Sequence, residues 1–424
     1  MKTFGPTTHE RVVMAALVAC AAFLPIIVPF AHKGAAPMIL LMGLAVASRG
    51  ETWRKGAPAF LLRPDFSNAL AVSALAVTAL TLWIGLAGLW APRADAPRLA
   101  LNVAAPIFAG GALVWEISRR PRGESDILAR VLAAGAAAAI LILLFEALTG
   151  GLLRALTPPA DPTDGRVEDW KELGRGATIA SVSLFGVLLL VGRLTRRRAV
   201  VAGLFAAALA AAIIFDITSN AAAIVLGALV FAAACARPNA TVAIITAIIV
   251  AALLLAPLAA LIPAEKIVAV VALPLSWAQR LFIWREGARA ALDCLPFGCG
   301  PDYARLLKET VGTVDLPGAP APLSKMPVHP HSVFLQLWLE TGLPGVVLFG
   351  AAICAGAVAA MRARLSQAEK AAIAATGAAM LVSALVEASL WQVWRLAIPS
   401  LAGLFIALAA KRREEEAVKK EPAL

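Results

Sequence analysis

The chain has 424 residues, of which 60% are apolar and 15% are charged. Soluble domains average about 45–50% apolar and about 25% charged residues, so folding alone would not remove this much apolar surface from water. The composition excludes an ordinary soluble domain. It also makes nucleic-acid binding a poor explanation of the net charge of +11, which is better explained by where the 38 Lys and Arg residues lie relative to a membrane.

Long, nearly uncharged runs recur along most of the chain. A transmembrane helix needs about 20 apolar residues, whereas a barrel strand needs about 10 residues of alternating polarity. The sequence therefore predicts an all-α polytopic membrane protein, with residues 1–424 forming one integral membrane domain. The twelve predicted spans are, in chain order, roughly 11–31, 34–48, 68–91, 98–117, 127–149, 176–192, 199–215, 220–236, 240–262, 333–361, 370–391 and 394–410.

The distribution of positive charge predicts the orientation of these spans. With a cytoplasmic N-terminus, the even-numbered connections and both termini carry more than half of the Lys and Arg residues. Because cytoplasmic connections are enriched in these residues, both termini are predicted to face the cytoplasm. The run at 11–31 is longer than a typical signal-peptide core, and no small-residue cleavage site follows it before Lys33. We therefore expect this run to be the first membrane anchor.

Two connections on the predicted outer side are longer than the others. Residues 150–175 form a small loop with three prolines, and residues 263–332 form a loop of about seventy residues. Long loops in compact proteins are usually functional or disordered. The second loop is rich in Leu, Phe and Trp from Leu275 to Leu307, which indicates folded structure. We therefore expect this larger outer loop to be folded and to carry function.

Cysteine usage gives little sign of metal or redox chemistry. Cys20, Cys235 and Cys354 lie in predicted spans, where a small buried side chain needs no functional explanation. Cys294 and Cys299 lie in the large loop, where an oxidising compartment would allow a disulfide. A disulfide needs a short distance between the two Cα atoms, and the spacing of the cysteines in the sequence does not determine that distance. The sequence has no metal-binding motif and no glycine-rich phosphate loop, so neither a metal nor a nucleotide cofactor is expected.

Histidine is scarce, and two of the four histidines lie together at the end of the large loop, in Pro-Val-His329-Pro-His331-Ser. Neutral imidazole is the side chain best suited to accept a proton near pH 7. His331 directly precedes a predicted membrane helix, where a polar group needs a partner or a function. Capping of that helix, or contact with lipid headgroups, would explain this position equally well.

Arginine supplies the second part of the predicted site. Arg280 lies on one face of a predicted helix, whereas Arg285 and Arg289 lie about 140° away, at about 100° per residue. Arg175 ends the smaller outer loop. A guanidinium binds phosphate oxygens in pairs, so these residues suit a lipid-linked phosphate or diphosphate. Pairing with nearby acidic side chains or with lipid headgroups is the alternative, and we prefer it for Arg289 and Arg305.

Three segments of the large loop and the next span form an ordered series. They read Arg280-Leu-Phe-Ile-Trp284, Pro296-Phe-Gly-Cys-Gly300, and His331-Ser332 followed after nine residues by Gly342-Leu-Pro-Gly345, with Glu340 between the last two. This series resembles the O-antigen ligase and polymerase superfamily of polytopic membrane glycosyltransferases, and the histidine spacing is of the ligase type. The resemblance covers about residues 170–350. Thr218-Ser219-Asn220 departs from the Ser-Arg-Gly that many relatives carry there.

The resemblance implies a reaction and roles for particular residues. A glycan would pass from undecaprenyl diphosphate to an acceptor sugar hydroxyl, without a metal or a nucleotide sugar. His331 matches the family's essential histidine, which takes the acceptor proton, and Arg280 matches the arginine that holds the diphosphate. The further residues expected to bind substrate are Arg175, Arg285, His329 and Glu340.

The resemblance also implies a partner and a location. The acceptor would be lipid A-core or another glycan, and the enzyme would lie in the bacterial inner membrane with its site facing the periplasm. Ligation of O-antigen is favoured over polymerisation of its repeat units by the histidine motif, the moderate length and the single large loop. Relatives that transfer glycans to Ser or Thr of a pilin share the histidine motif and are a further alternative within the family.

Two alternatives come from other classes of protein. A transporter or flippase of polysaccharide lipids commonly has twelve spans, but transporters place ionisable groups in mid-span and have two related halves. Here the spans carry few charges, and only one half has a large loop. A purely structural assembly protein is the third alternative.

Overall fold

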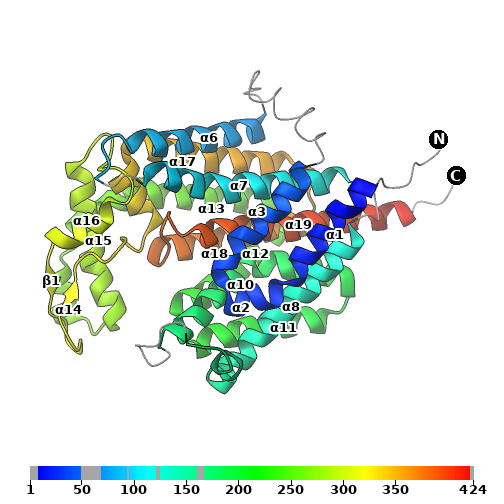
Figure 1. The fold of residues 1–424 in the computed structure, drawn as a ribbon, viewed down its shortest axis with the longest axis horizontal. Coiled ribbons are helices and arrows are strands. Elements are labelled where there is room, and N and C mark those ends of the chain that lie inside the picture. The colour runs from blue at the N-terminus through cyan, green and yellow to red at the C-terminus, as the bar shows by residue number, and fades with distance from the viewer. Residues whose placement is uncertain (1–7, 49–67, 93–94, 121–124, 160–166, 421–424) are drawn as a thin grey trace.

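The computed structural model describes residues 8–48, 68–92, 95–120, 125–159 and 167–420, and this part of the chain is almost entirely helical (Figure 1). Two short strands, β1 (Thr313–Val314) and β2 (Leu323–Ser324), pair antiparallel, with Thr313 opposite Ser324. The helices are α1 (Thr8–Ala22), α2 (Leu24–Phe30), η1 (His32–Gly34), α3 (Ala35–Ala47), α6 (Ala69–Ala87), α7 (Ala96–Arg119), α8 (Asp126–Thr149), α9 (Leu152–Ala155), α10 (Val167–Thr195), α11 (Arg198–Ile214), α12 (Thr218–Ala236), α13 (Pro238–Leu255), η2 (Ala256–Leu261), α14 (Ala264–Val270), α15 (Leu275–Asp293), α16 (Tyr303–Thr310), α17 (Val333–Arg362), α18 (Gln367–Val386) and α19 (Val393–Lys420).

The long apolar helices are those that the sequence predicted as membrane spans. Within the described residues, ten helical segments are long and apolar enough to cross a membrane. Two shorter apolar helices, His32–Ala47 and Arg198–Ile214, coincide with the spans expected at 34–48 and 199–215. The prediction of an all-α polytopic membrane protein is confirmed. The count of twelve spans and the orientation of the termini stay predictions.

Small residues allow the central helices to pack closely. Most residues of α10 between Leu173 and Val191 are buried, and α19 packs against both α10 and α7. At the contact of α7 with α19, a side chain at Gly110 would collide with Ser400. Membrane helices associate through van der Waals contact rather than through exclusion of water, so close approach of this kind stabilises the helical bundle.

The large loop between η2 and α17 is a folded layer at one end of this bundle, where Figure 1 places α14, α15, α16 and β1 together. It has an apolar core of its own, in which Ile283, Leu307 and Met326 pack with Leu339 of α17. The layer is therefore held together by its own core, which also attaches it to the first turns of α17. It lies over the ends of the spans.

The two ends of the described chain lie far from this layer. Figure 1 shows that α1 begins and α19 ends at the opposite end of the bundle. This placement agrees with two termini on one side of a membrane and the large loop on the other. The smaller loop, expected at 150–175, is partly helical, because α10 already begins at Val167; residues 160–166 lie outside the described part.

Candidate active site

Arg280 lies in the second turn of α15, which begins after Pro274. Its guanidinium carbon lies 5.3 Å from the centroid of the Trp277 ring. Its Nε is buried and meets no hydrogen-bond acceptor among the described residues. Burial lowers the pKa of Arg280, and the charge of Glu387 acts in the opposite direction. Since an arginine remains protonated in such surroundings, Arg280 is a half-buried cation with an unused donor.

His331 stands directly before α17 in an uncommon backbone conformation. Its φ is 51°, in the left-handed region that non-glycine residues rarely adopt. Its backbone N–H donates to Nδ1 of His329 at 3.1 Å, and the two imidazole centroids lie 4.3 Å apart. Ser332 then caps α17 by accepting from the backbone N–H of Leu335. The cap belongs to Ser332, so capping does not explain the histidine itself.

The two imidazoles are neutral at pH 7. Burial lowers the pKa of His331 to about 4, with a further contribution from the charge of Arg280. Glu387 opposes these effects, and Arg395 adds to them. Burial likewise lowers the pKa of His329 to about 3, helped by the repulsion that a protonated His331 would exert and by the charges of Arg395 and Arg305. A neutral imidazole has a free nitrogen lone pair, so each ring is able to accept a proton.

Glu387 and Arg395 reach the same place from the connection between α18 and α19. Glu387 follows α18 directly, and its carboxylate accepts a hydrogen bond from the Ser219 hydroxyl of α12. Arg395 lies in the first turn of α19, and its Nη2 lies 3.5 Å from Oε2 of Glu387. Its other nitrogens donate to Gln392 at 2.6 Å and to Ser383 at 2.8 Å. The carboxylate is therefore shared between a hydroxyl and a guanidinium.

Sequence reasoning did not include Glu387 and Arg395 in the site. Both lie more than fifty residues after His331, and no motif joins them to it. A signal was nevertheless present, because ionisable residues at the end of an apolar segment usually have a partner or a function. Trp394 is buried, and the Arg395 guanidinium lies 4.5 Å from its ring centroid.

Arg175 lies within α10, two turns after its start, rather than at the end of a loop. Its Nη1 lies 2.7 Å from carboxylate oxygens of both Glu168 and Glu172. Glu172 also lies 2.7 Å from Nδ1 of the buried His32. Arg175 is close enough to Arg395 for the two charges to interact. It therefore borders the group around His331, but two carboxylates already engage it.

Arg285 faces away from Arg280, toward α14. Its Nη2 donates to Glu265 at 2.9 Å and its Nε donates to Glu286 at 3.0 Å. The hydrogen bonds from Arg285 in turn lower the pKa of Glu265 to about 2, and the charge of Arg285 adds to this effect. The structure therefore gives Arg285 two carboxylate partners and does not bring it to His331. Arg289 and Arg305 pair with Glu286 at 3.7 Å and with Asp302 at 2.9 Å, as the alternative interpretation of these residues expected.

Glu340 is fully buried in α17 and joins three segments. Its carboxylate accepts hydrogen bonds from the backbone N–H of Asp302 at 2.8 Å, from the Trp391 indole at 2.6 Å and from Gln336 at 3.2 Å. Gln336 accepts in turn from the backbone N–H of Leu390 at 2.7 Å. The pair therefore holds the α18–α19 connection, with Glu387 and Arg395, against the start of α17.

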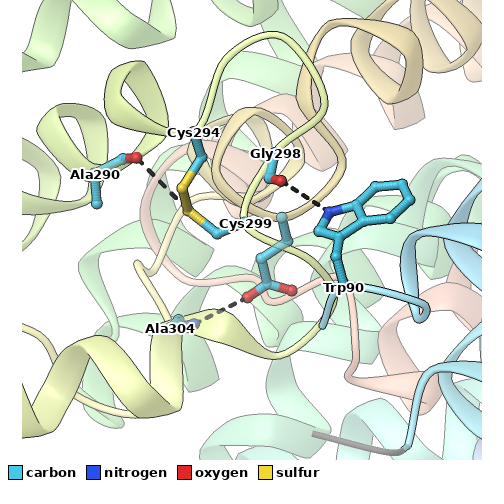
Figure 2. Close-up of a disulfide and its surroundings, with 7 residues drawn as sticks. Trp90, Ala290, Cys294, Gly298, Cys299 and Ala304 are labelled. Atoms are coloured by element: carbon cyan, nitrogen blue, oxygen red, sulfur yellow. Dashed lines mark hydrogen bonds between the residues drawn. A yellow bond between two sulfur atoms is a disulfide. The ribbon is translucent and has the colours of Figure 1, made fainter. Parts of the chain in front are cut away.

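Cys294 and Cys299 form a disulfide, with their Cα atoms 5.2 Å apart. Figure 2 shows the short turn that this bond closes, with the Trp90 indole directed at the carbonyl of Gly298; the hydrogen bond measures 3.0 Å. The Cys299 N–H donates to the carbonyl of Leu339 in α17 at 2.7 Å. The disulfide turn is therefore attached to α17 through its backbone.

This turn fills a break in α17. Gly342 has a φ of 61°, which interrupts the helix one turn after Leu339. The N–H of Leu343 donates to the carbonyl of Pro296 at 2.8 Å instead of continuing the helix. A Cβ added at Gly298 would lie 2.5 Å from the backbone nitrogen of Gly342, so only glycine permits this approach. The turn thereby satisfies a backbone group that the break would leave unpaired.

The structure thus separates the predicted site residues into two groups. Arg280, His329 and His331 lie together, joined by Glu387 and Arg395 and bordered by Arg175. Arg285 and Glu340 lie outside this group, and their side chains already form hydrogen bonds with other residues. Among the described residues, no three His, Cys, Asp or Glu side chains are placed to hold one metal ion. We call the first five residues the histidine–arginine cluster.

The chain was compared with known proteins. Residues 218–350 match the family model described as O-Antigen ligase. Over these residues the chain is similar to the O-antigen ligase family. This result confirms the resemblance predicted from the sequence, and it covers about a third of the 424 residues. None of the curated proteins compared with the chain matches it.

The boundaries of the matched segment, residues 218–350, divide the histidine–arginine cluster. The match contains Arg280, His329 and His331, together with the whole loop layer and the disulfide turn. Glu387 and Arg395 lie after its end, and Arg175 lies before its beginning. The family implies a membrane glycosyltransferase-like enzyme with a lipid-linked glycan as substrate. In this chain, helices outside the matched domain complete the surroundings of its histidine.

Proposed function

We propose that this protein is a glycosyltransferase of the bacterial inner membrane that moves a glycan from undecaprenyl diphosphate to an acceptor hydroxyl on the periplasmic side. The most specific form of the proposal is ligation of O-antigen to lipid A-core. The observation that carries it is the meeting of a neutral imidazole, His331, with the half-buried Arg280 at the end of a membrane span.

In the proposed reaction, His331 takes the proton of the acceptor hydroxyl as its oxygen attacks the anomeric carbon of the donor. The bond between that carbon and the diphosphate oxygen breaks, and the electron pair leaves with the diphosphate. Arg280, with an unused Nε donor, is suited to neutralise the departing charge. Positioning and charge neutralisation are the main requirements, because a neutralised diphosphate is a good leaving group.

The low pKa of His331 is consistent with this proposal in a particular way. Without substrate, burial and the charge of Arg280 keep the pKa near 4, which makes the imidazole a weak base. A bound diphosphate would offset the arginine charge, and the pKa would rise toward its ordinary range. The imidazole would then gain basicity when the donor is in place, and we expect transfer to fail as the pH falls and His331 becomes protonated.

The decisive experiment is transfer by the purified chain from undecaprenyl-diphosphate glycan to lipid A-core, with a chelator present. His331→Ala and Arg280→Ala are each expected to lower kcat by about 10²–10⁴-fold while the protein remains inserted and abundant. Arg289→Ala, an exposed position on the same helix as Arg280, is the matched control and should transfer normally. Normal transfer by His331→Ala or Arg280→Ala would remove that residue from the mechanism.

The products in cells distinguish the forms of the proposal. Loss of a ligase leaves lipid-linked polymer and bare core, loss of a repeat-unit polymerase leaves a single repeat unit on the core, and loss of a transporter leaves neither product outside. The first pattern is the expected one. The second would assign the same chemistry to polymerisation, and the third would overturn the proposal.

A further inference from the structure

An exposed apolar surface runs through η2 and α14, outside the group of residues described above. Leu261 is 77% exposed and Val270 is 82% exposed, and Leu258 and Val271 are exposed as well. Across residues 254–275 only Glu265 and Lys266 are charged. A water-facing loop rarely exposes large apolar side chains in such a series, so this surface requires an explanation.

The opposite face of α14 is fixed. Ala264 is fully buried in an apolar core with Phe282 of α15 and with Leu316. In the first turn of α14, Glu265 accepts a 2.9 Å hydrogen bond from Arg285, which is itself buried. The helix is therefore held against α15 by an apolar contact and by an ion pair. Its exposed side is a defined surface rather than the result of a loosely attached segment.

This surface continues the outer surface of a membrane span. The apolar segment that includes α13 extends from Pro238 to Leu261, and its last residues of α13, Leu254 and Leu255, are exposed to whatever surrounds the bundle. In a polytopic membrane protein that surrounding medium is lipid. Ala264 follows Leu261 by only three residues, so α14 begins where the span leaves the hydrocarbon.

We propose that η2 and α14 rest in the lipid of the outer leaflet, and that they form the membrane-facing wall beside which the lipid-linked donor approaches Arg280. The occupant of the surface is the bilayer itself. An interfacial helix of this kind buries its apolar face near the headgroups. The role of this wall in the approach of the donor rests on the proposed function. The contact of η2 and α14 with lipid depends only on the membrane placement of the spans.

The geometry links this wall to the diphosphate site. α15 begins at Leu275, four residues after Val271, and carries Arg280 in its second turn. Trp277 lies between Leu275 and Arg280 in α15, and its indole contacts the Arg280 guanidinium. An indole of this kind favours the boundary between lipid and water. A donor whose polyprenyl tail stays in the leaflet would thus meet Arg280 at headgroup depth.

The depth of α14 can be measured without any assay of transfer. We would replace the free cysteines with Cys20→Ser, Cys235→Ser and Cys354→Ser, add Val270→Cys, and label it with an environment-sensitive fluorophore. In phosphatidylethanolamine and phosphatidylglycerol vesicles, nitroxide-bearing phosphatidylcholine should quench this label several-fold more than a label at Arg289→Cys. Arg289 is the matched control, because it is exposed on α15. Equal quenching at the two positions would overturn the proposal.

The role as an entrance wall is tested by comparing two donors. Val270→Glu with Val271→Glu should raise KM about tenfold for the undecaprenyl donor in vesicles, because the charged wall no longer rests in lipid. The same variant should use a short-chain, water-soluble donor in detergent like the unsubstituted protein. Thr310→Glu, at an exposed position of α16, is the control. It should leave the KM for both donors unchanged. Equal losses with both donors would contradict the entrance role.

These results separate the two proposals. If the unsubstituted protein transfers no glycan from either donor while Val270→Cys is strongly quenched, the proposed function fails and the membrane contact stands. If transfer occurs and the label at residue 270 is not quenched, the membrane contact fails and the enzyme stands.

Discussion

On one face of α15, Arg285 is buried between Glu265 and Glu286, with hydrogen bonds of 2.9 and 3.0 Å. On the other face, the buried Nε of Arg280 has no acceptor in the described part of the chain. Its guanidinium contacts the Trp277 ring and interacts with the charge of Glu387. The two residues share a helix and a side-chain type. They differ in whether their donors are already used, and that difference indicates which arginine has capacity for a ligand.

The strongest test of the difference between Arg280 and Arg285 is to replace each of them with glutamine. Arg280→Gln should lower kcat by about 10²–10³-fold, because a donor for the departing charge is lost. Arg285→Gln should lower kcat less than tenfold and should mainly lower the thermal unfolding temperature, because it releases α14 from α15. Steady-state kinetics with thermal unfolding of both variants would test this, and equal kinetic losses would abolish the distinction between the faces.

Glu387 supplies the next largest expected effect. Its charge raises the pKa of His331, so Glu387→Gln should lower that pKa further. A weaker base at neutral pH should reduce kcat by about tenfold, and the acidic limb of the pH profile should move to lower pH. Glu309→Gln, on the exposed side of α16, serves as the control. A reduced rate with an unmoved acidic limb would assign Glu387 to holding Arg395 and Ser219 rather than to tuning the histidine.

The disulfide turn should produce a smaller effect, and mainly on stability. Cys294→Ser with Cys299→Ser removes a covalent closure, for which about 2 kcal/mol is expected from the short loop that it closes. The loop layer should therefore unfold at a lower temperature. A reductant should lower the unfolding temperature of the unsubstituted protein but not that of this variant. Cys235→Ser, which changes an exposed free cysteine, should behave like the unsubstituted protein.

Much of this arrangement was predictable because it is local in the sequence. The apolar runs predicted the membrane helices, and the helical phase of α15 predicted that Arg285 would lie away from Arg280. The inferences about the spans and the helical phase hold because helical periodicity and the length of a membrane span are set by nearby residues. The order of the motifs predicted that Arg280 and His331 belong to one catalytic site, and this stays a prediction.

The rest depends on contacts between segments far apart in the chain. Glu387 and Arg395 join His331 only because Gln336 and Glu340 hold the α18–α19 connection against α17. The position of Glu340 was predictable from the motif, but its burial and its saturated hydrogen bonds were not. The spacing of Cys294 and Cys299 left their pairing open, since the turn between them is shaped by the break in α17.

The contact between Gly298 and Gly342 restricts how this protein can vary. Neither residue belongs to the histidine–arginine cluster, yet a methyl group at either position would drive the disulfide turn and the broken helix apart. In a library carrying every amino acid at each position, these two sites should therefore be among the least tolerant in the protein. A map of mutational tolerance would then mark them as strongly as any catalytic residue, for reasons of backbone clearance alone.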